Sequence, residues 1–364
     1  MSSISCRLVS HSVSQHIQQL YTGYYMLQRR GLIRLTQEIQ DVKVLDETRP
    51  RHLQNARYPH LRVVLNGRVK VHYDAHDSWE IDENFLAEAD LYFKRSFSSE
   101  RLDQLITGRE KIRPLGLNYL VYPDQLDGWA LRRHAALGTA KERLLASTRS
   151  FGFMDGLRFV PRVRRMEALP DFDASPRILF MARAWEPTEA RDGMDAKQED
   201  RRHLNETRAE CIRQLRSAFG RDFYGGLMHT EYAKSHFADV LLPDEGEASK
   251  RAYIDRLARH AICVATTGLH GSIGWKLGEY VAFSKAIVSE KLRYAVPGAF
   301  AEGTHYLTFE TPEECVERVG RLYTDHALRR SLMTNNARYY DAHVRPDALV
   351  LNTMLAALAE VDQP

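Results

Sequence analysis

The fold is restricted most by a regular alternation of short apolar runs and longer amphipathic runs between residues 176 and 310. Strand-like runs such as RILFMA, AICVATT and AIVSE are separated by stretches with apolar residues at helical spacing, such as NETRAECIRQLRSAFG and SKRAYIDRLARH. Strands that alternate with helices form parallel sheets, because neighbouring parallel strands need a long crossover connection. This half is therefore predicted to be an α/β domain with a parallel sheet.

The first half of the chain shows a second α/β pattern. ISCRLVS, the helical run QHIQQLYTGYYMLQRR and LIRLTQE read as strand, helix and strand. Two β-branched runs flank Asn66-Gly67, a pair that favours a hairpin turn, and Asp82 is placed to cap a short helix. Further along we expect a strand at LYFKRSF, a strand-like run at KIRPLGLNYLVYP and helix at LRRHAALGTAKERLLAS.

Domain boundaries follow from where this alternation stops and restarts. RFVPRVRRMEALPDFDASP contains three prolines and little periodicity, so it is the best linker and places the boundary near Pro176. We expect an N-terminal α/β domain with linker at 1–175, a C-terminal α/β domain at 176–345 and a final helix at 346–364. The predicted class is α/β, with two Rossmann-like domains that face a cleft where a ligand binds.

Composition argues against several classes of protein. Four cysteines lie far apart, which favours reduced thiols over a disulfide framework or a zinc site, and no apolar run approaches the ~20 residues of a membrane helix. The sequence has no secretory signal pattern, so we expect a cytoplasmic protein. Separately, we expect that the protein does not bind nucleic acid. Residues 1–175 carry 26 Lys and Arg against 21 Asp and Glu. This basic half could bind a phosphate-bearing substrate or contact an anionic membrane face, although plain solvation explains the same excess.

The stretch AICVATTGLHGSIGWKLGEY has the order strand, glycine-containing loop and helix. In an open parallel sheet such a loop offers backbone N–H groups and the positive end of a helix to an anion. We expect Gly271, Ser272, Ile273 and Gly274 to receive a diphosphate and Glu279 to accept hydrogen bonds from ribose hydroxyls. The alternative is that the glycines only form turns and that Glu279 is a solvated helix residue.

Residues 176–345, with AIVSEKL and the run TPEECVERVGRLYTDHALRRSLMTNNARYY, resemble the donor-binding domain of GT-B glycosyltransferases of the group-1 type. In that family the helix after the loop carries a Glu that binds the nucleotide ribose, which corresponds to Glu279. The resemblance also implies that the last helix crosses back to pack on the first domain. Retaining members similar to this pattern have Glu, seven residues, then Glu, but here the first position is Gly271, and His270 is the nearest polar substitute.

Cations and a general base complete the expected site. Charge develops on the leaving diphosphate, so Arg183 and Arg208 are predicted to contact it, while Lys94 and Arg95 could face the same cleft from the first domain. Either Arg183 or Arg208 could instead form a surface ion pair. For a direct attack by the acceptor hydroxyl, Asp77 is the predicted base and His76 the second choice, unless they serve only to cap a turn and to pack.

The resulting hypothesis is a metal-independent glycosyltransferase that moves a sugar from a nucleotide-diphosphate donor to a hydroxyl acceptor, with no cofactor besides this co-substrate. By analogy, the acceptor would be a glycan of the cell surface. Two alternatives stay open: a nucleotide-sugar epimerase or hydrolase, and a nucleotide-sugar binding protein without catalysis. A dehydrogenase is disfavoured, because the first strand-to-helix turn, LVSHSVSQH, has no G-x-G-x-x-G.

Overall fold

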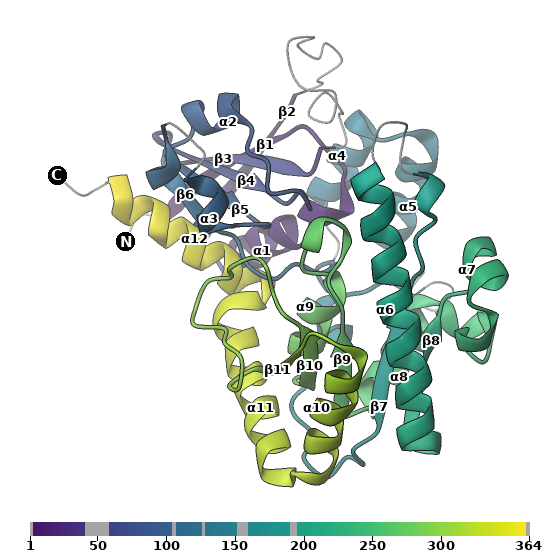
Figure 1. Cartoon of the computed structure of the whole chain (residues 1–364). Helices are drawn as coiled ribbons and strands as arrows, with labels where there is room; N and C mark the ends of the chain where they lie inside the picture. Colours follow the sequence, from purple (N-terminus) through teal and green to yellow (C-terminus); the bar gives the residue numbers. More distant parts are fainter. Residues whose placement is uncertain are drawn as a thin grey trace. The chain divides into compact units, whose positions relative to one another are not determined.

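The computed structural model describes residues 3–40, 58–103, 107–125, 128–150, 159–189 and 195–361 (Figure 1). The chain forms two compact units. Unit 1 comprises Met1–Arg165, Tyr294–Gly298 and Asp341–Pro364, and unit 2 comprises Met166–Arg293 and Ala299–Tyr340. Each unit contains its own sheet and hydrophobic core, so the predicted α/β class with two Rossmann-like sheets is confirmed.

Unit 1 is built on a six-stranded sheet with the order β2-β1-β3-β4-β5-β6. The strands are β1 (Ile4–Ser10), β2 (Ile33–Ile39), β3 (His60–Leu65), β4 (Val69–Asp74), β5 (Leu91–Lys94) and β6 (Ile112–Pro114). All neighbouring pairs are parallel except the two that involve β3. The predicted hairpin joins β3 and β4 through Asn66 and Gly67, whose φ angles are 51° and 69°. The carboxyl ends of the other five strands consequently meet at one edge.

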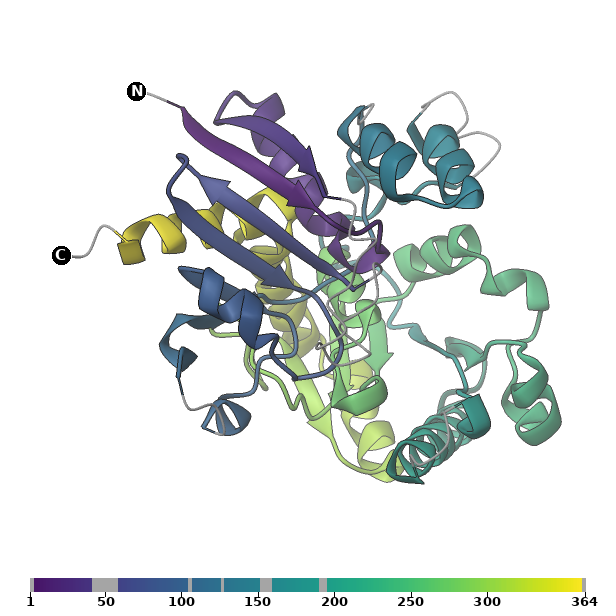
Figure 2. The same cartoon turned by 90° about the horizontal axis from the view of Figure 1, so that it is seen from above.

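Helices cover both faces of this sheet. On one face, α1 (Gln18–Arg29) and α12 (Pro346–Val361) pack side by side, and a Cβ on Gly23 would lie 2.1 Å from the carbonyl oxygen of Pro346. This close approach requires glycine. The shorter helices are α2 (Glu83–Glu88), which begins at the predicted cap Asp82, α3 (Ser99–Leu102), α4 (Gly128–Leu137) and α5 (Ala140–Ser150). Helices α4 and α5 form a pair, which Figure 2 shows from above.

Unit 2 contains a fully parallel five-stranded sheet with the order β11-β10-β9-β7-β8. Its strands are β7 (Ile178–Ala182), β8 (Phe223–Leu227), β9 (Ile262–Ala265), β10 (Ala286–Glu290) and β11 (Tyr306–Phe309). The helices are α6 (Asp195–Phe219), α7 (Glu231–His236), α8 (Lys250–Arg259), α9 (Trp275–Ala282), α10 (Pro312–Thr324) and α11 (His326–Tyr339). The strands are buried along their length, as the predicted parallel pattern requires.

The structure corrects two local predictions and describes most of the expected linker. The single helix expected at 131–147 is two helices, because Thr139 starts a new one by exchanging hydrogen bonds with Glu142. The strand-like run expected at 111–123 forms only the three-residue strand β6. The expected linker, whose first residue 158 lies outside the described residues, contains a 3-10 turn at Val163–Arg165, and its Val160, Val163 and Met166 are buried. Among the described helices, none is long and apolar enough to cross a membrane.

Candidate functional site

The strand order of unit 2 reverses at one point of the sheet. The chain passes from β7 outward to β8 and then returns to β9 on the other side of β7. The loops after β7 and β9 therefore leave the sheet in opposite directions, and ligands of open α/β sheets bind beyond the strands at such a reversal. The two loops begin at Arg183 and at Thr266. Both loops belong to segments that the sequence analysis predicted to form the ligand site.

Arg208, on α6, ties these two loops together. Its Nη1 donates to the carbonyl oxygen of Arg183 at 2.7 Å, its Nη2 to that of Thr267 at 2.8 Å, and its Nε to Oγ1 of Thr266 at 2.9 Å. Only 6% of the residue is exposed, and this burial lowers the pKa of Arg208 to about 10. Arg208, which was predicted to contact the diphosphate, therefore lies at the expected edge of the sheet. All three of its guanidinium nitrogens, however, already donate hydrogen bonds to the two loops and hold these loops together.

Arg183, unlike Arg208, is not buried. Its side chain is exposed, and the guanidinium lies over the ring of Trp185, 4.7 Å from the ring centroid. In the described part of the chain, no carboxylate forms an ion pair with it. Of the two predicted arginines, Arg183 is the one that can turn toward an anion without breaking a buried contact.

The glycine-rich loop differs from the expected anion cradle. The N–H groups of Gly271 and Ser272 donate within the loop, to the carbonyl oxygens of Gly268 at 3.1 Å and Leu269 at 3.2 Å. Gly271 has a φ of 67°, and a Cβ there would lie 2.7 Å from Cδ of Arg293. These two expected N–H donors are therefore already used, which corrects that part of the prediction.

Beside Gly271, the expected sugar contact His270 is exposed and has a left-handed φ of 61°. Its N–H donates to Oδ2 of Asp200 on α6 at 3.2 Å. Helix α9 begins at Trp275, with Gly274 as its N-cap and Ile273 buried before it. The positive end of α9 thus starts at Trp275 and Lys276.

Glu279 is buried one turn into α9 and forms an ion pair with Lys250 at the start of α8. Lys276 lies next to the same group, with its Nζ 4.1 Å from the ring centroid of Tyr253. Burial lowers the pKa of Lys276 to about 8, an effect that Glu279 opposes and that Lys250 and Arg208 reinforce. Three cations and Glu279 therefore act on each other here, and the carboxylates of Glu290 and Asp200 also act on Arg208.

Sequence reasoning missed both lysines. Lys276 lies inside the quoted loop-and-helix stretch, and its position in the first turn of the helix was the available signal. Lys250 gave no such signal, because its role depends on how α8 packs near α9. Glu290 was missed too: at the end of β10 it accepts hydrogen bonds from N and Oγ1 of Thr267, at 2.5 and 2.8 Å, which fixes the loop after β9.

In unit 1, polar residues at the ends of β4 and β5 form a buried ion pair. Oδ2 of Asp74 accepts from Lys94 Nζ at 2.8 Å and from the hydroxyls of Tyr58 and Tyr92 at 3.0 and 2.6 Å. Oδ1 accepts from the N–H of His76 at 2.9 Å. Burial raises the pKa of Asp74, but Lys94 and these donors outweigh it and lower the pKa. Lys94, only 1% exposed, therefore holds the loop after β4 in place and does not present its charge to a cleft.

The predicted base Asp77 is brought together with Arg95, the residue that follows β5. The two form an ion pair, and Nη1 of Arg95 also lies 3.1 Å from Nδ1 of His16. Burial raises the pKa of Asp77, but the charge of Arg95 outweighs this effect and lowers the pKa, so the carboxylate is ionised. Its side chain remains 40% exposed.

His16 was not predicted, although it stands between the first strand and the first helix of the sequence. Burial lowers its pKa to about 4. Because a guanidinium can only donate, Nδ1 of His16 accepts from Arg95, and the neutral ring carries its proton on Nε2. His76, the second predicted base, accepts a hydrogen bond from the N–H of Ser78 at Nδ1 and stacks on Tyr58 with 5.1 Å between ring centroids.

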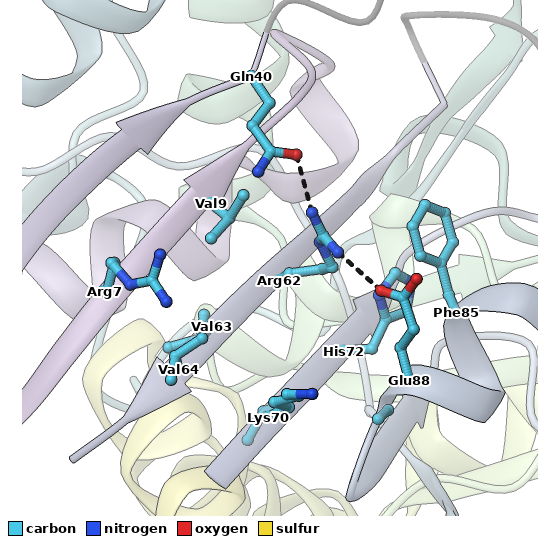
Figure 3. Close-up of a pocket in the computed structure, with 12 residues that line it drawn as sticks. Arg7, Val9, Gln40, Arg62, Val63, Val64, Lys70, His72, Phe85 and Glu88 are labelled. Carbon is cyan, nitrogen blue, oxygen red and sulfur yellow. Dashed lines mark hydrogen bonds and ion pairs between the residues drawn. The ribbon is translucent and has the colours of Figure 1, made fainter. Parts of the chain in front are cut away.

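A pocket of about 230 Å³ opens on the face of this sheet beside α2 (Figure 3). Arg62 extends across it between Gln40 and Glu88, to which it donates hydrogen bonds of 2.8 Å each. Arg7, on β1, is paired with Glu38. Two cations of this pocket are thus already neutralised by carboxylates, so its chemistry suits an anion less well than the cluster of unit 2.

Comparisons with known proteins give structural similarity only. No family model matches the chain, and no curated protein matches it either. Among solved structures, a glycosyltransferase from Rickettsia africae is 12% identical, covering 95% of this chain and 82% of its own, with a TM-score of 0.43.

Anabaena HepE in complex with UDP and glucose is 9% identical over 95% of this chain and 94% of its own, with a TM-score of 0.42. A putative UDP-N-acetylglucosamine 2-epimerase from Listeria monocytogenes is 11% identical over 99% and 97%, with a TM-score of 0.40. Similarities of this size assign neither an activity nor a substrate.

Proposed function

We propose that the protein is a GT-B glycosyltransferase that takes its sugar from a nucleotide-diphosphate donor bound to unit 2. The observation that carries this proposal is the group of three cations beside the sheet reversal, where Arg208, Lys250 and Lys276 lie with Glu279. A nucleoside diphosphate carries the opposite charge in two adjacent groups. Its sugar ring offers the paired hydroxyls that one carboxylate can accept.

In the proposed complex, the diphosphate lies near the start of α9, where Lys276 and the helix N-terminus neutralise it. Arg183 can turn from Trp185 toward the same charge. These groups stabilise the negative charge that grows on the leaving diphosphate as the glycosidic bond breaks, so no metal ion is needed in the proposal. Glu279 accepts hydrogen bonds from the ribose, and Lys250 then shifts its charge toward the phosphates.

On the acceptor side, unit 1 supplies Asp77 as the proposed base, with His76 next to it. Arg95 keeps Asp77 ionised, so its exposed carboxylate can orient an acceptor hydroxyl and accept its proton as the bond to the sugar forms. We also propose a cytoplasmic enzyme that acts in cell-surface glycan synthesis. The basic excess of residues 1–175 supports peripheral contact with an anionic membrane face.

One observation favours a second candidate function, that of a nucleotide-sugar binding protein without catalysis. The position eight residues before Glu279 is Gly271, whose left-handed backbone and contact with Arg293 leave no room for a carboxylate. A binding protein without catalysis would tolerate this. Nucleotide binding with no release of nucleotide from any sugar donor, with or without acceptor, would identify that case, whereas release without an acceptor would indicate a hydrolase or epimerase.

The test is equilibrium binding of UDP, GDP, ADP, CDP and dTDP to the full chain, by calorimetry and thermal shift. We expect one diphosphate to bind, and Lys276→Met and Glu279→Gln each to weaken it by about tenfold or more, since each removes a charged contact worth about 1.4 kcal/mol or more. Lys234→Met is the matched control, because Lys234 is an exposed lysine of α7 in the same unit. If no diphosphate binds, or if Lys276→Met binds like the parent, the donor site is wrong.

A further inference from the structure

Unit 1 contains a buried arginine that has no acidic partner among the described residues. Arg133, on α4, is 1% exposed, and its guanidinium stacks on Tyr21 of α1 with 3.4 Å between Cζ and the ring centroid. Its Nη2 donates to Oε1 of Gln18 at 3.0 Å. The side chain is the largest among those that are fully buried in the described residues.

The other nitrogens of Arg133 are unsatisfied. Nε and Nη1 are buried and have no hydrogen-bond acceptor within the described ranges, where no carboxylate pairs with the group either. A buried charge is normally compensated by an opposite charge, since its desolvation penalty is large. A water molecule could accept the N–H groups, but it would leave the charge uncompensated. The missing partner is therefore expected to be an anion.

A cavity of about 250 Å³ lies beside Gln18, the residue that accepts the hydrogen bond from Arg133. It lies between the loop from β1 to α1 and the pair α4 and α5, and Gln18, the partner of Arg133, is part of its wall. His134, the next residue of α4, lines it too. Hydroxyl and amide groups of Ser14 and Gln15 and the apolar side chains of Val13 and Leu145 complete most of the wall.

The acidic residue of the cavity is committed elsewhere. Glu142 accepts hydrogen bonds from N and Oγ1 of Thr139 at 2.8 and 2.9 Å, which caps the start of α5. Within the described residues it forms no ion pair with Arg133. The cavity also adjoins the first residues of α1, whose helix end adds positive potential.

From this arrangement we infer a binding site for an oxyanion, a carboxylate or a phosphate, that belongs to a hydroxyl-rich ligand. The oxyanion takes the place of the Gln18 amide at the guanidinium and receives two of its N–H groups, while the amides and hydroxyls of the wall bind the hydroxyls. If the proposed function holds, this ligand is the acceptor, and the acceptor is an acidic or phosphorylated sugar. That last step rests on the proposed function, whereas the oxyanion site does not.

The test compares charged and neutral sugars on the full chain. We expect glucuronate, glucose 6-phosphate or both to bind at least tenfold more tightly than glucose, as measured by calorimetry. A preference for glucuronate would assign a carboxylate, and one for glucose 6-phosphate a phosphate. Equal binding of glucose, or no binding of either anion, overturns the site.

Variants separate recognition from folding. Arg133→Met should fold, because it removes an uncompensated buried charge, and should lose at least tenfold in anion binding. Gln18→Glu gives the guanidinium an internal carboxylate, so it should raise the melting temperature and abolish anion binding. The control is Arg132→Met, an exposed neighbour on the same helix. Anion binding that persists in Arg133→Met overturns the proposal. Nucleotide binding, measured in parallel, reports on unit 2, so a failure of the donor site and a failure of this site are distinguishable.

Discussion

Replacing Arg208 tests whether its first role is to brace the two loops at the sheet reversal. Arg208→Met keeps a long apolar side chain but removes the three hydrogen bonds to the loops after β7 and β9. Arg208→Lys keeps the charge, but a single ammonium group cannot reach both carbonyl oxygens with the geometry of a guanidinium. We expect the methionine variant to be the less stable of the two.

The size of the effect follows from two opposing contributions. Three hydrogen bonds from a charged donor contribute about 1.5–3 kcal/mol each, which gives roughly 5–9 kcal/mol. Burial opposes them: it lowers the pKa of Arg208 to about 10, and a change of that size corresponds to about 3 kcal/mol. The difference predicts that Arg208→Met lowers the free energy of unfolding of unit 2 by about 2–6 kcal/mol.

Urea unfolding, followed by fluorescence and circular dichroism, measures this change. Arg202→Met is the matched control on the same helix, where an exposed arginine pairs with Glu199, and we expect it to stay within about 0.5 kcal/mol of the parent. If Arg208→Met is as stable as the parent but no longer binds nucleotide diphosphates, the bracing argument is refuted and Arg208 is a ligand residue.

Three other changes test separate features of the two units. Asp74→Asn should lower the free energy of unfolding by about 3–5 kcal/mol, because Lys94 is left buried without its partner, and adding Lys94→Met should recover part of this loss in a double-mutant cycle. The parent should become more stable between pH 8 and pH 10.5, because the folded state lowers the pKa of Lys276 and the unfolded chain holds that proton longer. Unfolding curves of Lys276→Met should lack this rise. Gly271→Ala should cost about 1–2 kcal/mol in thermal unfolding, because the residue has a left-handed backbone and little space beside Arg293. Unchanged stability would contradict each of these expectations.

The fold could be predicted largely from local patterns. Strands β1, β2, β7 and β9 and the hairpin at Asn66-Gly67 fall where apolar periodicity and turn residues place them, since those signals act over a few residues. Errors occurred where a local signal was weak. Gly138 was passed over inside a helical pattern, although it precedes the capping residue Thr139 that starts α5.

The candidate site was predictable only in part. Asp77 and Arg95 follow neighbouring parallel strands, so their meeting follows from sheet geometry. The brace formed by Arg208 involves main-chain carbonyls of loops about 60 and 25 residues away, and the sequence carries no signal for such bonds. Likewise, the ion pair of Glu279 with Lys250 depends on the packing of two helices, which periodicity does not determine.

The way in which α12 completes unit 1 has a consequence for the order of folding. Leu349, Val350 and Met354 of this helix share a core with residues of β1 and α1, and the whole sequence of unit 2 is synthesised between them. Unit 2 can thus bury its own core during synthesis, whereas unit 1 exposes the apolar face of α1 until α12 emerges. Contacts this distant in sequence slow folding and prolong exposure to aggregation. Truncation before Pro346 should therefore leave a folded unit 2 joined to an aggregation-prone unit 1.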